Sequence, residues 1–275
     1  GALLNTMSEG SRKIWTVGSG LTAGLNNFTD ANRAQLQAAL YEGAGIAPTD
    51  AQLSRLVRFV RGVDAYDENS NGNSTEERWK LGDIYHSEAA IVSPPAARTS
   101  TRKEDINTEA YYRSQTGYEA FKSARATRPS VVYVGANDGM LHAFNADTGI
   151  ERWAFIPPPL LPKLRAMESA SANKSNSIYG VDGSPAVNDV FYAGRWRTVL
   201  VSGLGSGGKG YFALDVTDPD NPAHLFSFAH DASEKFVYTW AADGRRTTYS
   251  YLVAGAVPAA ADFSALGDAW SKPVI

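Results

Sequence analysis

The amino-acid sequence predicts a protein dominated by β-structure: a partial β-propeller with a small helical segment at its N-terminal end. Short apolar runs rich in β-branched residues alternate with glycine-containing turns in 131–156, and the same three-strand pattern returns in 196–228. Each copy follows a segment that opens on serine, at Ser87 and at Ser184, and a third such segment begins at Ser271. We therefore expect about two four-stranded antiparallel blades and the start of a third.

The composition limits the classes of function. The chain has 275 residues, of which 43% are hydrophobic and 20% are charged, as in a globular protein. Its formal net charge of −3 gives no electrostatic reason to expect nucleic-acid binding. The absence of cysteine excludes disulfides, thiolate metal sites and cysteine catalysis. No apolar run approaches the ~20 residues of a membrane helix, so we expect no transmembrane segment in this chain.

The two ends of the sequence indicate that the chain belongs to a longer protein. It begins at Gly1 rather than at a methionine, and it ends at Ile275 inside an expected strand. A ring of blades needs at least ~4 blades to close. We therefore expect an interior part of a longer protein, with further blades after Ile275.

Residues 1–80 form the expected accessory segment, which mixes helices with loops and leads into the propeller. One strand is predicted at 13–18, and a short helix is predicted to end at Gly43. Thr49 and Gln52 have the spacing of a capping box at the start of a second helix. This helix carries one apolar stripe at positions i, i+3, i+4 and i+7, formed by Leu53, Leu56, Val57 and Val60.

Residues 81–275 form the expected partial propeller, in which long insertions separate the strands. The blades are predicted near 81–156 and 181–228, and the next blade is predicted to start near 266. Some helix is expected around 118–124. The insertions that lengthen the repeat are 93–127, 157–180 and 229–265.

One turn of the first blade has a specific pattern. Asp147, Thr148 and Gly149 form a turn, and Trp153 follows four residues later. Glycine suits the positive φ of such a turn, and the aspartate can bond its backbone. The pattern resembles the tryptophan-docking turn of quinoprotein-type β-propellers. We therefore expect Trp153 to be buried against the neighbouring blade.

The loop at 67–77 has the character of a metal site. Oxygen-bearing side chains occupy alternate positions, and Gly72 is at the sixth position, as in the first half of an EF-hand calcium loop. The twelfth position is Arg78 instead of the usual glutamate. The alternative is a solvated loop rich in asparagine, serine and glycine. The candidate calcium ligands are Asp67, Asn69, Asn71, Asn73 and Glu76.

Two other patterns favour structural interpretations. The stretch 203–210 matches a phosphate-binding loop as far as its lysine, but glycine follows instead of serine or threonine, and a strand is expected next. A glycine-rich turn between strands is the better interpretation. The four histidines are dispersed, and His142 lies in an expected strand. A packed, hydrogen-bonded histidine is favoured there over a catalytic one.

Several longer strings together resemble one family. They are LGDIYHS, YVGANDGMLHAFNADTG, WAFIPPPLLPKL, YGVDGSPAVNDV, WRTVLVSGLGSGGKGYFALDVTDP and LGDAWSKPVI. The motif Leu-Gly-Asp introduces both the first and the last of these strings. The chain is similar, from about Ile14 to Ile275, to the C-terminal propeller of the PilC/PilY family, whose members are associated with the tip of the type IV pilus.

This resemblance implies a non-enzymatic protein that supports pilus assembly, opposes retraction and mediates adhesion and twitching motility. Its implied partners are the minor pilins of the type IV pilus and a host or abiotic surface. The implied location is the pilus tip at the cell surface, or the periplasm or outer membrane of a Gram-negative bacterium. Calcium binding in the family implies a loop in a later blade, beyond Ile275, so the loop at 67–77 would be a separate calcium site.

Two other functions share the propeller fold. A quinoprotein dehydrogenase that uses pyrroloquinoline quinone has similar docking turns, but the sequence shows no acidic base with a cofactor-stacking set and no vicinal cysteines. A scaffold propeller of outer-membrane assembly would share the docking turns but not LGDIYHS or the long insertions. We expect no enzymatic activity.

Overall fold

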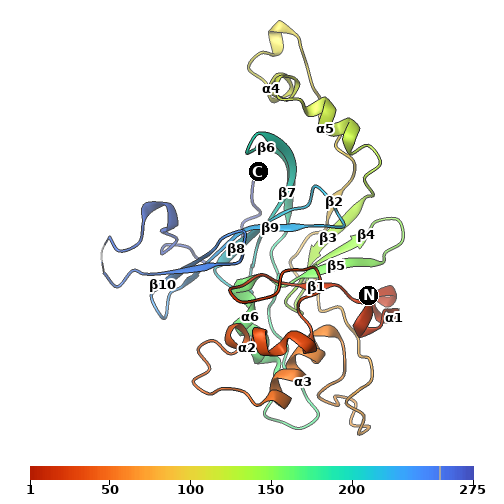
Figure 1. The fold of residues 1–275 in the computed structure, drawn as a ribbon, viewed down its shortest axis with the longest axis vertical. Coiled ribbons are helices and arrows are strands. Elements are labelled where there is room, and N and C mark those ends of the chain that lie inside the picture. The colour runs from red at the N-terminus through yellow and green to blue at the C-terminus, as the bar shows by residue number, and fades with distance from the viewer. Residues whose placement is uncertain (254) are drawn as a thin grey trace.

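The computed structural model describes residues 1–253 and 255–275, and it places two sheets next to each other above a helical region (Figure 1). One sheet has five strands and the other has six. Strands β2 and β6, which begin the two repeats, are in contact. Mostly antiparallel sheets that meet through their first strands are what the partial-propeller prediction requires.

The first sheet has the order β1-β5-β4-β3-β2. Four of its strands are antiparallel neighbours: β2 (Ala90–Val92), β3 (Val131–Gly135), β4 (Leu141–Asn145) and β5 (Glu151–Phe155). These are the four predicted strands of the first blade. The fifth strand, β1 (Ile14–Trp15), is parallel to β5.

The outer edge of β1 is closed by a side chain. Asn27 Oδ1 accepts a hydrogen bond from the Thr16 backbone N–H at 2.9 Å, and Asn27 Nδ2 donates to the Thr16 carbonyl at 2.9 Å. These bonds satisfy backbone groups that an exposed edge strand would offer to another chain. Residues 14–16 of the N-terminal segment therefore extend the first sheet by one strand.

The second sheet has the order β11-β10-β9-β8-β7-β6, and all its neighbours are antiparallel. Its strands are β6 (Ala186–Tyr192), β7 (Arg195–Gly203), β8 (Gly210–Asp215), β9 (Ala223–Asp231), β10 (Phe236–Trp240) and β11 (Arg246–Ser250). Strands β6 to β9 are the predicted second blade. The hairpin of β10 and β11 extends it within the segment that we expected to be an insertion, because alternation of aromatic residues along β10 provides one packed face.

The strand expected at 271–275 is not formed. Within the described residues 266–275 the backbone makes one isolated bridge, between Ala269 and Gly205. A strand requires a continuous hydrogen-bonded neighbour, and Pro273 cannot donate to one. The segment is held instead by single bonds, such as the one from Asn188 Nδ2 to the Ile275 carbonyl at 2.9 Å.

The helices occupy two regions. The lower region contains α1 (Ala2–Thr6), α2 (Arg33–Leu40), α3 (Asp50–Arg61) and α6 (Leu161–Leu164), and the upper arm contains α4 (Glu109–Gln115) and α5 (Tyr118–Ala124). The predicted capping box of α3 is confirmed, since Thr49 and Gln52 bond each other's backbone. The 3-10 turns are Glu9–Ser11, Asp30–Asn32, Lys103–Asp105, Pro158–Leu160, Arg165–Met167 and Ala259–Ala261.

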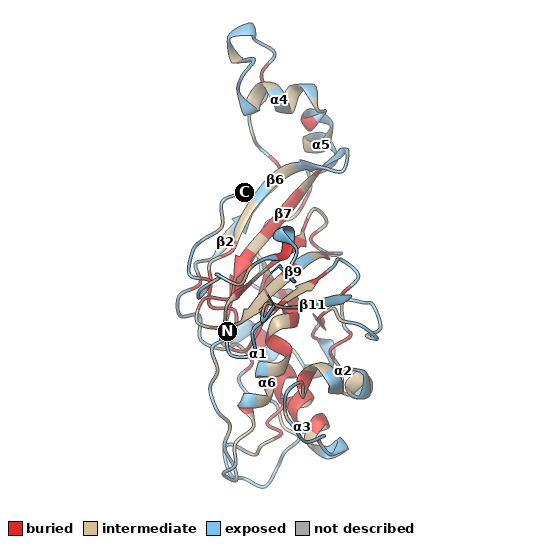
Figure 2. Cartoon of the chain, turned by 90° about the vertical axis from the view of Figure 1, so that its left-hand side faces the viewer, coloured by how far each residue is buried: buried red, intermediate tan, exposed pale blue. Residues whose placement is uncertain are grey.

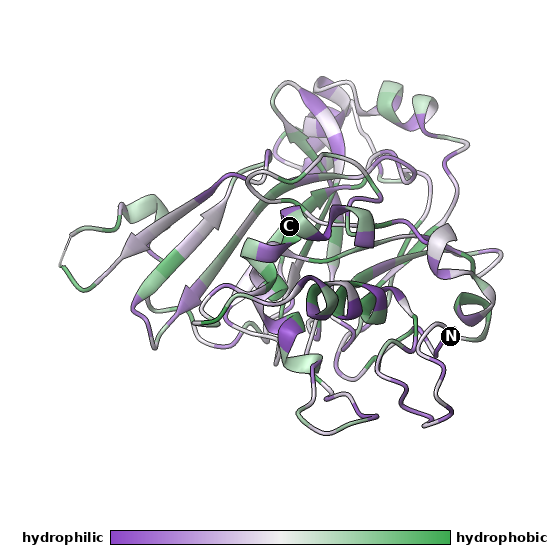
Figure 3. Cartoon of the chain, turned by 60° about the horizontal axis from the view of Figure 1, so that its bottom comes forward, coloured by the Kyte–Doolittle hydropathy of each residue, from purple (hydrophilic) through white to green (hydrophobic). Residues whose placement is uncertain are grey.

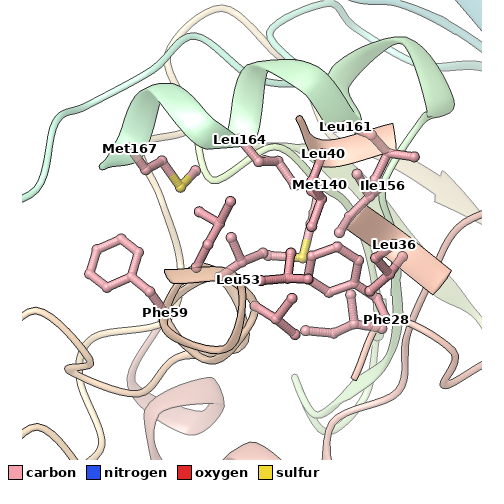
Figure 4. Packing of buried hydrophobic residues seen from close by; sticks show 14 of the residues in the cluster. Phe28, Leu36, Leu40, Leu53, Phe59, Met140, Ile156, Leu161, Leu164 and Met167 are labelled. Atoms are coloured by element: carbon pink, nitrogen blue, oxygen red, sulfur yellow. The ribbon is translucent and has the colours of Figure 1, made fainter. Parts of the chain in front are cut away.

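Buried residues form two clusters (Figure 2). In the lower cluster Leu53 of α3 packs with Leu36 of α2, Met140 and Leu164 (Figure 4). The other cluster lies between the sheets, where the Phe155 ring is 5.6 Å from that of Phe212. Hydrophobic residues follow the central strands of both sheets, whereas the outlying loops are more polar (Figure 3). Burial of apolar surface between the sheets is the main stabilising term.

The insertion at 93–127 forms an arm that projects from the sheets (Figures 1 and 2). It leaves the first sheet after β2, contacts the second sheet and re-enters the first sheet at β3. Tyr118 Oη donates to Asp189 Oδ2 at 2.6 Å, and Trp196 Nε1 donates to the Thr116 carbonyl at 3.0 Å. The base of the arm therefore links the two sheets.

Candidate functional site

Trp153 joins the two sheets. Its side chain is buried, and its Nε1 donates a hydrogen bond of 2.9 Å to the carbonyl of Pro219, in the turn between β8 and β9. Its ring also lies 6.0 Å from that of Trp15 and 5.8 Å from that of Tyr133. A buried indole whose N–H has a partner combines apolar burial with one directed bond. The geometry is the one that the docking interpretation requires.

The turn before Trp153 is built by a residue that the sequence interpretation missed. Asn145 Oδ1 accepts bonds of 2.9 Å from the backbone N–H groups of Asp147 and Thr148. Gly149 has φ of +71°, which favours glycine. All three predicted turn residues are exposed, so only Trp153 of the predicted set reaches the second sheet. The turn determines where β5 begins, and it therefore determines the position of Trp153 in that strand.

A second contact lies next to this one. Arg152 Nη1 forms an ion pair with Asp220, the residue after Pro219. Two successive residues of β5 therefore hold two successive residues of the neighbouring sheet's turn. The 218–221 turn is itself ordered by Asp218, which accepts bonds from Asp220 N and Asn221 Nδ2 at 3.0 Å.

The loop at 67–77 is folded around its carboxylates. Asp67 Oδ1 accepts bonds from the backbone N–H groups of Asn71 at 3.0 Å and Gly72 at 3.1 Å. Gly72 has φ of +81°, as the sharp turn of a calcium loop requires. Asn69 Oδ1 accepts from the same Asn71 N–H at 3.1 Å. Asp67 and Asn69 therefore both direct a side-chain oxygen to the Asn71 N–H, whereas Asn71 Oδ1 accepts from the Asn73 N–H at 2.8 Å.

Glu76 returns to this loop, whereas the side chain of Asn73 turns away. Glu76 Oε1 accepts hydrogen bonds from the amide groups of both Asn69 and Asn71, the latter at 2.9 Å. Asn73 Oδ1 instead accepts from Thr75 at 2.7 Å. The donor set is all oxygen, with two carboxylates, which fits a hard cation such as calcium. In the described part of the chain no group of three or more His, Cys, Asp or Glu side chains could hold a metal.

His142 belongs to a buried charged cluster in the first sheet. Its Nδ1 lies 2.8 Å from Glu151 Oε1 and its Nε2 lies 3.0 Å from Asp138 Oδ2. Arg12 Nε donates to Glu151 Oε2 at 2.9 Å. Sequence reasoning predicted a hydrogen-bonded His142 but missed Arg12 and Glu151, since these two lie 139 positions apart. The signal in the sequence for this cluster was Glu151, a charged residue next to the apolar residues of the strand 151–155.

The cluster is a structural ion network. Burial opposes the charged forms, but the two carboxylates raise the pKa of His142 to about 9. Burial likewise opposes the charge of Glu151, yet its bonds to His142 and Arg12 lower its pKa to about 2. A carboxylate–histidine pair can serve a nucleophile, but His142 is fully buried and both ring nitrogens are bonded to carboxylates.

The glycine-rich stretch 203–210 is a packed turn, as expected. Strand β8 begins at its end, so no helix N-terminus receives an anion. A Cβ on Gly207 would lie 1.7 Å from the Gly180 carbonyl oxygen, so this glycine allows close backbone packing.

A pocket of about 330 Å³ lies at the junction of the N-terminal segment and the second sheet. Its apolar walls include Trp15, Val17, Leu21, Leu25, Pro222 and Ala242. The polar side chain of Asn27 is already bonded to Thr16 and Thr22.

No helix in the part of the chain that the structure describes is both long and apolar enough to span a membrane.

Two repeated antiparallel sheets, docked through an inserted tryptophan, define a piece of a β-propeller. The model of the PilY1 beta-propeller domain matches residues 81–235 of the chain. The chain belongs to this PilY1 propeller family, the PilC/PilY family that its motifs resemble.

Named relatives are similar over most of the chain. A type IV pilus biogenesis factor PilY1 of Pseudomonas aeruginosa is 35% identical over 243 residues, which are 87% of this chain and 20% of that protein. A PilY1 homolog of Xylella fastidiosa is 38% identical over 192 residues, covering 70% of this chain and 15% of that protein. The chain therefore spans about a fifth of the length of the first of these relatives.

A solved structure is also similar. The crystal structure of the PilY1 C-terminal domain of Pseudomonas aeruginosa is 36% identical in sequence and has a TM-score of 0.35. The match covers 51% of this chain and 30% of that chain.

Proposed function

We propose that the chain is a non-enzymatic propeller module of a type IV pilus biogenesis factor. The observation that carries this proposal is the family match over 81–235, together with relatives named as pilus biogenesis factors. The module acts at the cell surface or in the periplasm of a Gram-negative bacterium. Its partners are the minor pilins of the pilus tip and a host or abiotic surface. Through them it supports assembly, opposes retraction, and mediates adhesion and twitching motility.

The docked blades support a binding role. A propeller holds its loops on rigid sheets, and such loops can bind partners without any catalytic group. The Trp153 contact and the base of the arm both fix one sheet to the next. The arm and the loops at the ends of the strands then have fixed relative positions, as a pilin-binding surface requires.

Exchange of the matching propeller segment tests the proposal. The corresponding residues of Pseudomonas aeruginosa PilY1 would be replaced by this chain. The exchanged protein would be produced in a strain from which the PilY1 gene has been deleted, and surface pili and twitching would be measured. We expect the exchanged protein to restore pili. A folded, exported exchange protein that restores none would contradict the proposal. The same exchange with Trp153→Ala should restore fewer pili.

The alternative from another class is a quinoprotein dehydrogenase. Pyrroloquinoline quinone and calcium would be added to the full-length protein that contains this chain, and reduction of an electron-accepting dye would be followed with several alcohols. The proposed function expects no dye reduction above a control without protein. Quinone-dependent reduction would support the enzyme instead.

Calcium regulation through the loop at 67–77 is the second part of the proposal. Asp67, Asn69, Asn71 and Glu76 would supply side-chain oxygens, and Asn73 would supply its carbonyl. Bound calcium would order the connection between α3 and the first sheet. A site with ~0.1 mM affinity would be mostly filled outside the cell, where weak extracellular modules bind in the same range.

Calorimetric titration with calcium chloride tests this site. Binding heat is expected for the unmodified chain and should be lost in Asp67→Ala. Asn73→Ala is the matched control, because it removes a side chain that points to Thr75 but keeps the carbonyl. Equal heat in all three proteins, or none in any, would leave the segment as a solvated loop.

A further inference from the structure

The two Leu-Gly-Asp motifs bring distant residues together on one surface. The ring of His86, just after the first motif, lies 5.1 Å from the ring of Trp270, just after the second, at an interplanar angle of 86°. The Tyr85 ring lies 4.2 Å from the His86 ring. We call Tyr85, His86 and Trp270 the aromatic surface. It is formed by two segments that lie far apart in the sequence.

The aromatic surface is open to solvent. Tyr85 is 67% exposed and Trp270 is 53% exposed, while the His86 side chain is 43% exposed. Large aromatic residues usually bury their rings, and a contiguous exposed group of them marks an interaction site. Single exposed aromatic residues such as Trp79 occur elsewhere and need no such explanation.

His86 is held in one orientation by a buried carboxylate. Its Nδ1 lies 2.7 Å from Asp182 Oδ2, and its backbone N–H donates to Asp182 Oδ1 at 3.1 Å. The Asp182 side chain is fully buried. Among the described residues nothing bonds His86 Nε2, which leaves this atom for a ligand. A preoriented side chain loses less conformational entropy on binding.

The border of the surface carries both charges. Glu88 Oε2 and Lys272 Nζ form an ion pair of 3.1 Å, and each lies two residues after a member of the aromatic surface. Because these two charges are paired with each other, the border has no net charge that would attract a cationic or an anionic ligand. A neutral ligand rich in hydroxyl groups can donate to the carboxylate and accept from the ammonium.

We propose that the aromatic surface binds a neutral saccharide chain. The C–H faces of sugar rings would pack on Tyr85 and Trp270, and hydroxyl groups would bond His86 Nε2, Glu88 and Lys272. This assignment rests on the proposed attachment to surfaces and names its ligand class. It does not depend on pilus assembly.

The test uses the purified chain and a panel of defined neutral oligosaccharides: the hexaoses of glucose in α-1,4 and β-1,4 linkage, of mannose, and of N-acetylglucosamine. Binding is measured by calorimetry and by tryptophan fluorescence. At least one oligosaccharide should bind, and Trp270→Ala and Tyr85→Ala should each weaken it at least tenfold. Trp79→Ala is the matched control, since Trp79 is 55% exposed but lies outside the surface. Circular dichroism verifies that each variant is folded.

The possible outcomes separate this inference from the proposed function. Equal binding by Trp270→Ala and Trp79→Ala, or no binding by any oligosaccharide up to millimolar concentration, overturns the saccharide assignment. Binding of polylysine that is lost in Trp270→Ala, without saccharide binding, also overturns it and assigns a cationic ligand. Each of these results leaves the pilus assay unaffected. Loss of pili in the exchange experiment with retained saccharide binding would contradict the proposed function alone.

Discussion

At the residue scale, the main feature is a buried charged cluster in the first sheet. It contains a histidine, two carboxylates and a guanidinium. His142 has Asp138 on one ring nitrogen and Glu151 on the other, and Arg12 completes the set. Buried charges are costly unless each one is paired and hydrogen-bonded. The cluster meets this condition and joins the N-terminal segment to β4 and β5. Its stability contribution depends on pH.

Stability should fall at alkaline pH because of His142. The folded-state pKa of about 9 lies above the ordinary 6.5, so the stabilisation is complete below about 6.5 and is lost as pH rises through about 9. Urea unfolding at pH 7 and pH 10 should show a loss on the order of a few kcal/mol that is absent in His142→Gln. An identical pH dependence in both proteins would contradict the charged state of this histidine.

Stability should also fall at acidic pH because of Glu151. Its folded-state pKa of about 2 lies below the ordinary 4.5, so its stabilisation is present above about 4.5 and is lost as pH falls through about 2. Glu151→Gln should therefore destabilise the chain at pH 7 and flatten the acid side of the stability profile. Unfolding curves at pH 3 and pH 7 provide the measurement. A variant that keeps the full acid-dependent loss would show that other carboxylates cause it.

The strand β5 is the element on which the contact between sheets depends. It receives β1 on one side and β4 on the other, and Trp153 extends from it to Pro219. Trp153→Ala should cost about 3–5 kcal/mol of unfolding free energy, since it removes a buried aromatic side chain. Trp153→Phe should cost less, because it keeps a ring and loses mainly the bond to the carbonyl.

Urea denaturation of these two variants beside Trp79→Ala measures the difference. The exposed Trp79 should change stability by less than about 0.5 kcal/mol. A cost for Trp153→Ala no larger than that of Trp79→Ala would show that the indole does not hold the sheets together.

Helix α3 depends on its first turn. Thr49 accepts from the Gln52 backbone, and Gln52 bonds the Thr49 N–H in return at 2.9 Å. Thr49→Ala should cost about 1 kcal/mol, and Thr49→Ser should cost little because its hydroxyl can still cap the helix. Thermal unfolding of both variants is the measurement. Equal losses in the two would show that the hydroxyl bond is not what matters.

At the scale of the whole molecule, much of the fold could be predicted from local sequence patterns. Turn glycines and β-branched runs predicted the four antiparallel strands of each blade, and the capping box predicted the start of α3. The strand β1 lies within the strand predicted at 13–18, but its parallel pairing with β5 could not be predicted, because the two strands lie far apart in the sequence. The β10–β11 hairpin was not predicted, because it lies outside the four-strand repeat and adds to the second sheet only by pairing with β9.

The candidate sites show the same division between local and distant partners. The loop at 67–77 was visible because its residues are close in sequence. The partners of Trp153 and His86 lie 66 and 96 positions away, so only the assembled sheets show them. Contacts of this kind depend on topology, which sequence spacing does not specify.

The central claim is that the two sheets are successive blades docked at the turn after β8. The chain has no cysteine, so thiols can be introduced without interference. In a variant with Arg152→Cys and Asp220→Cys, a short bis-maleimide should link the two positions rapidly within one molecule. The control pair, Arg152→Cys with Glu109→Cys, joins β5 to the projecting arm and should remain unlinked (Figure 1). Mass spectrometry of the digested protein identifies the linked peptides. Equal linkage in both pairs, or none at 152 and 220, would contradict the docked arrangement.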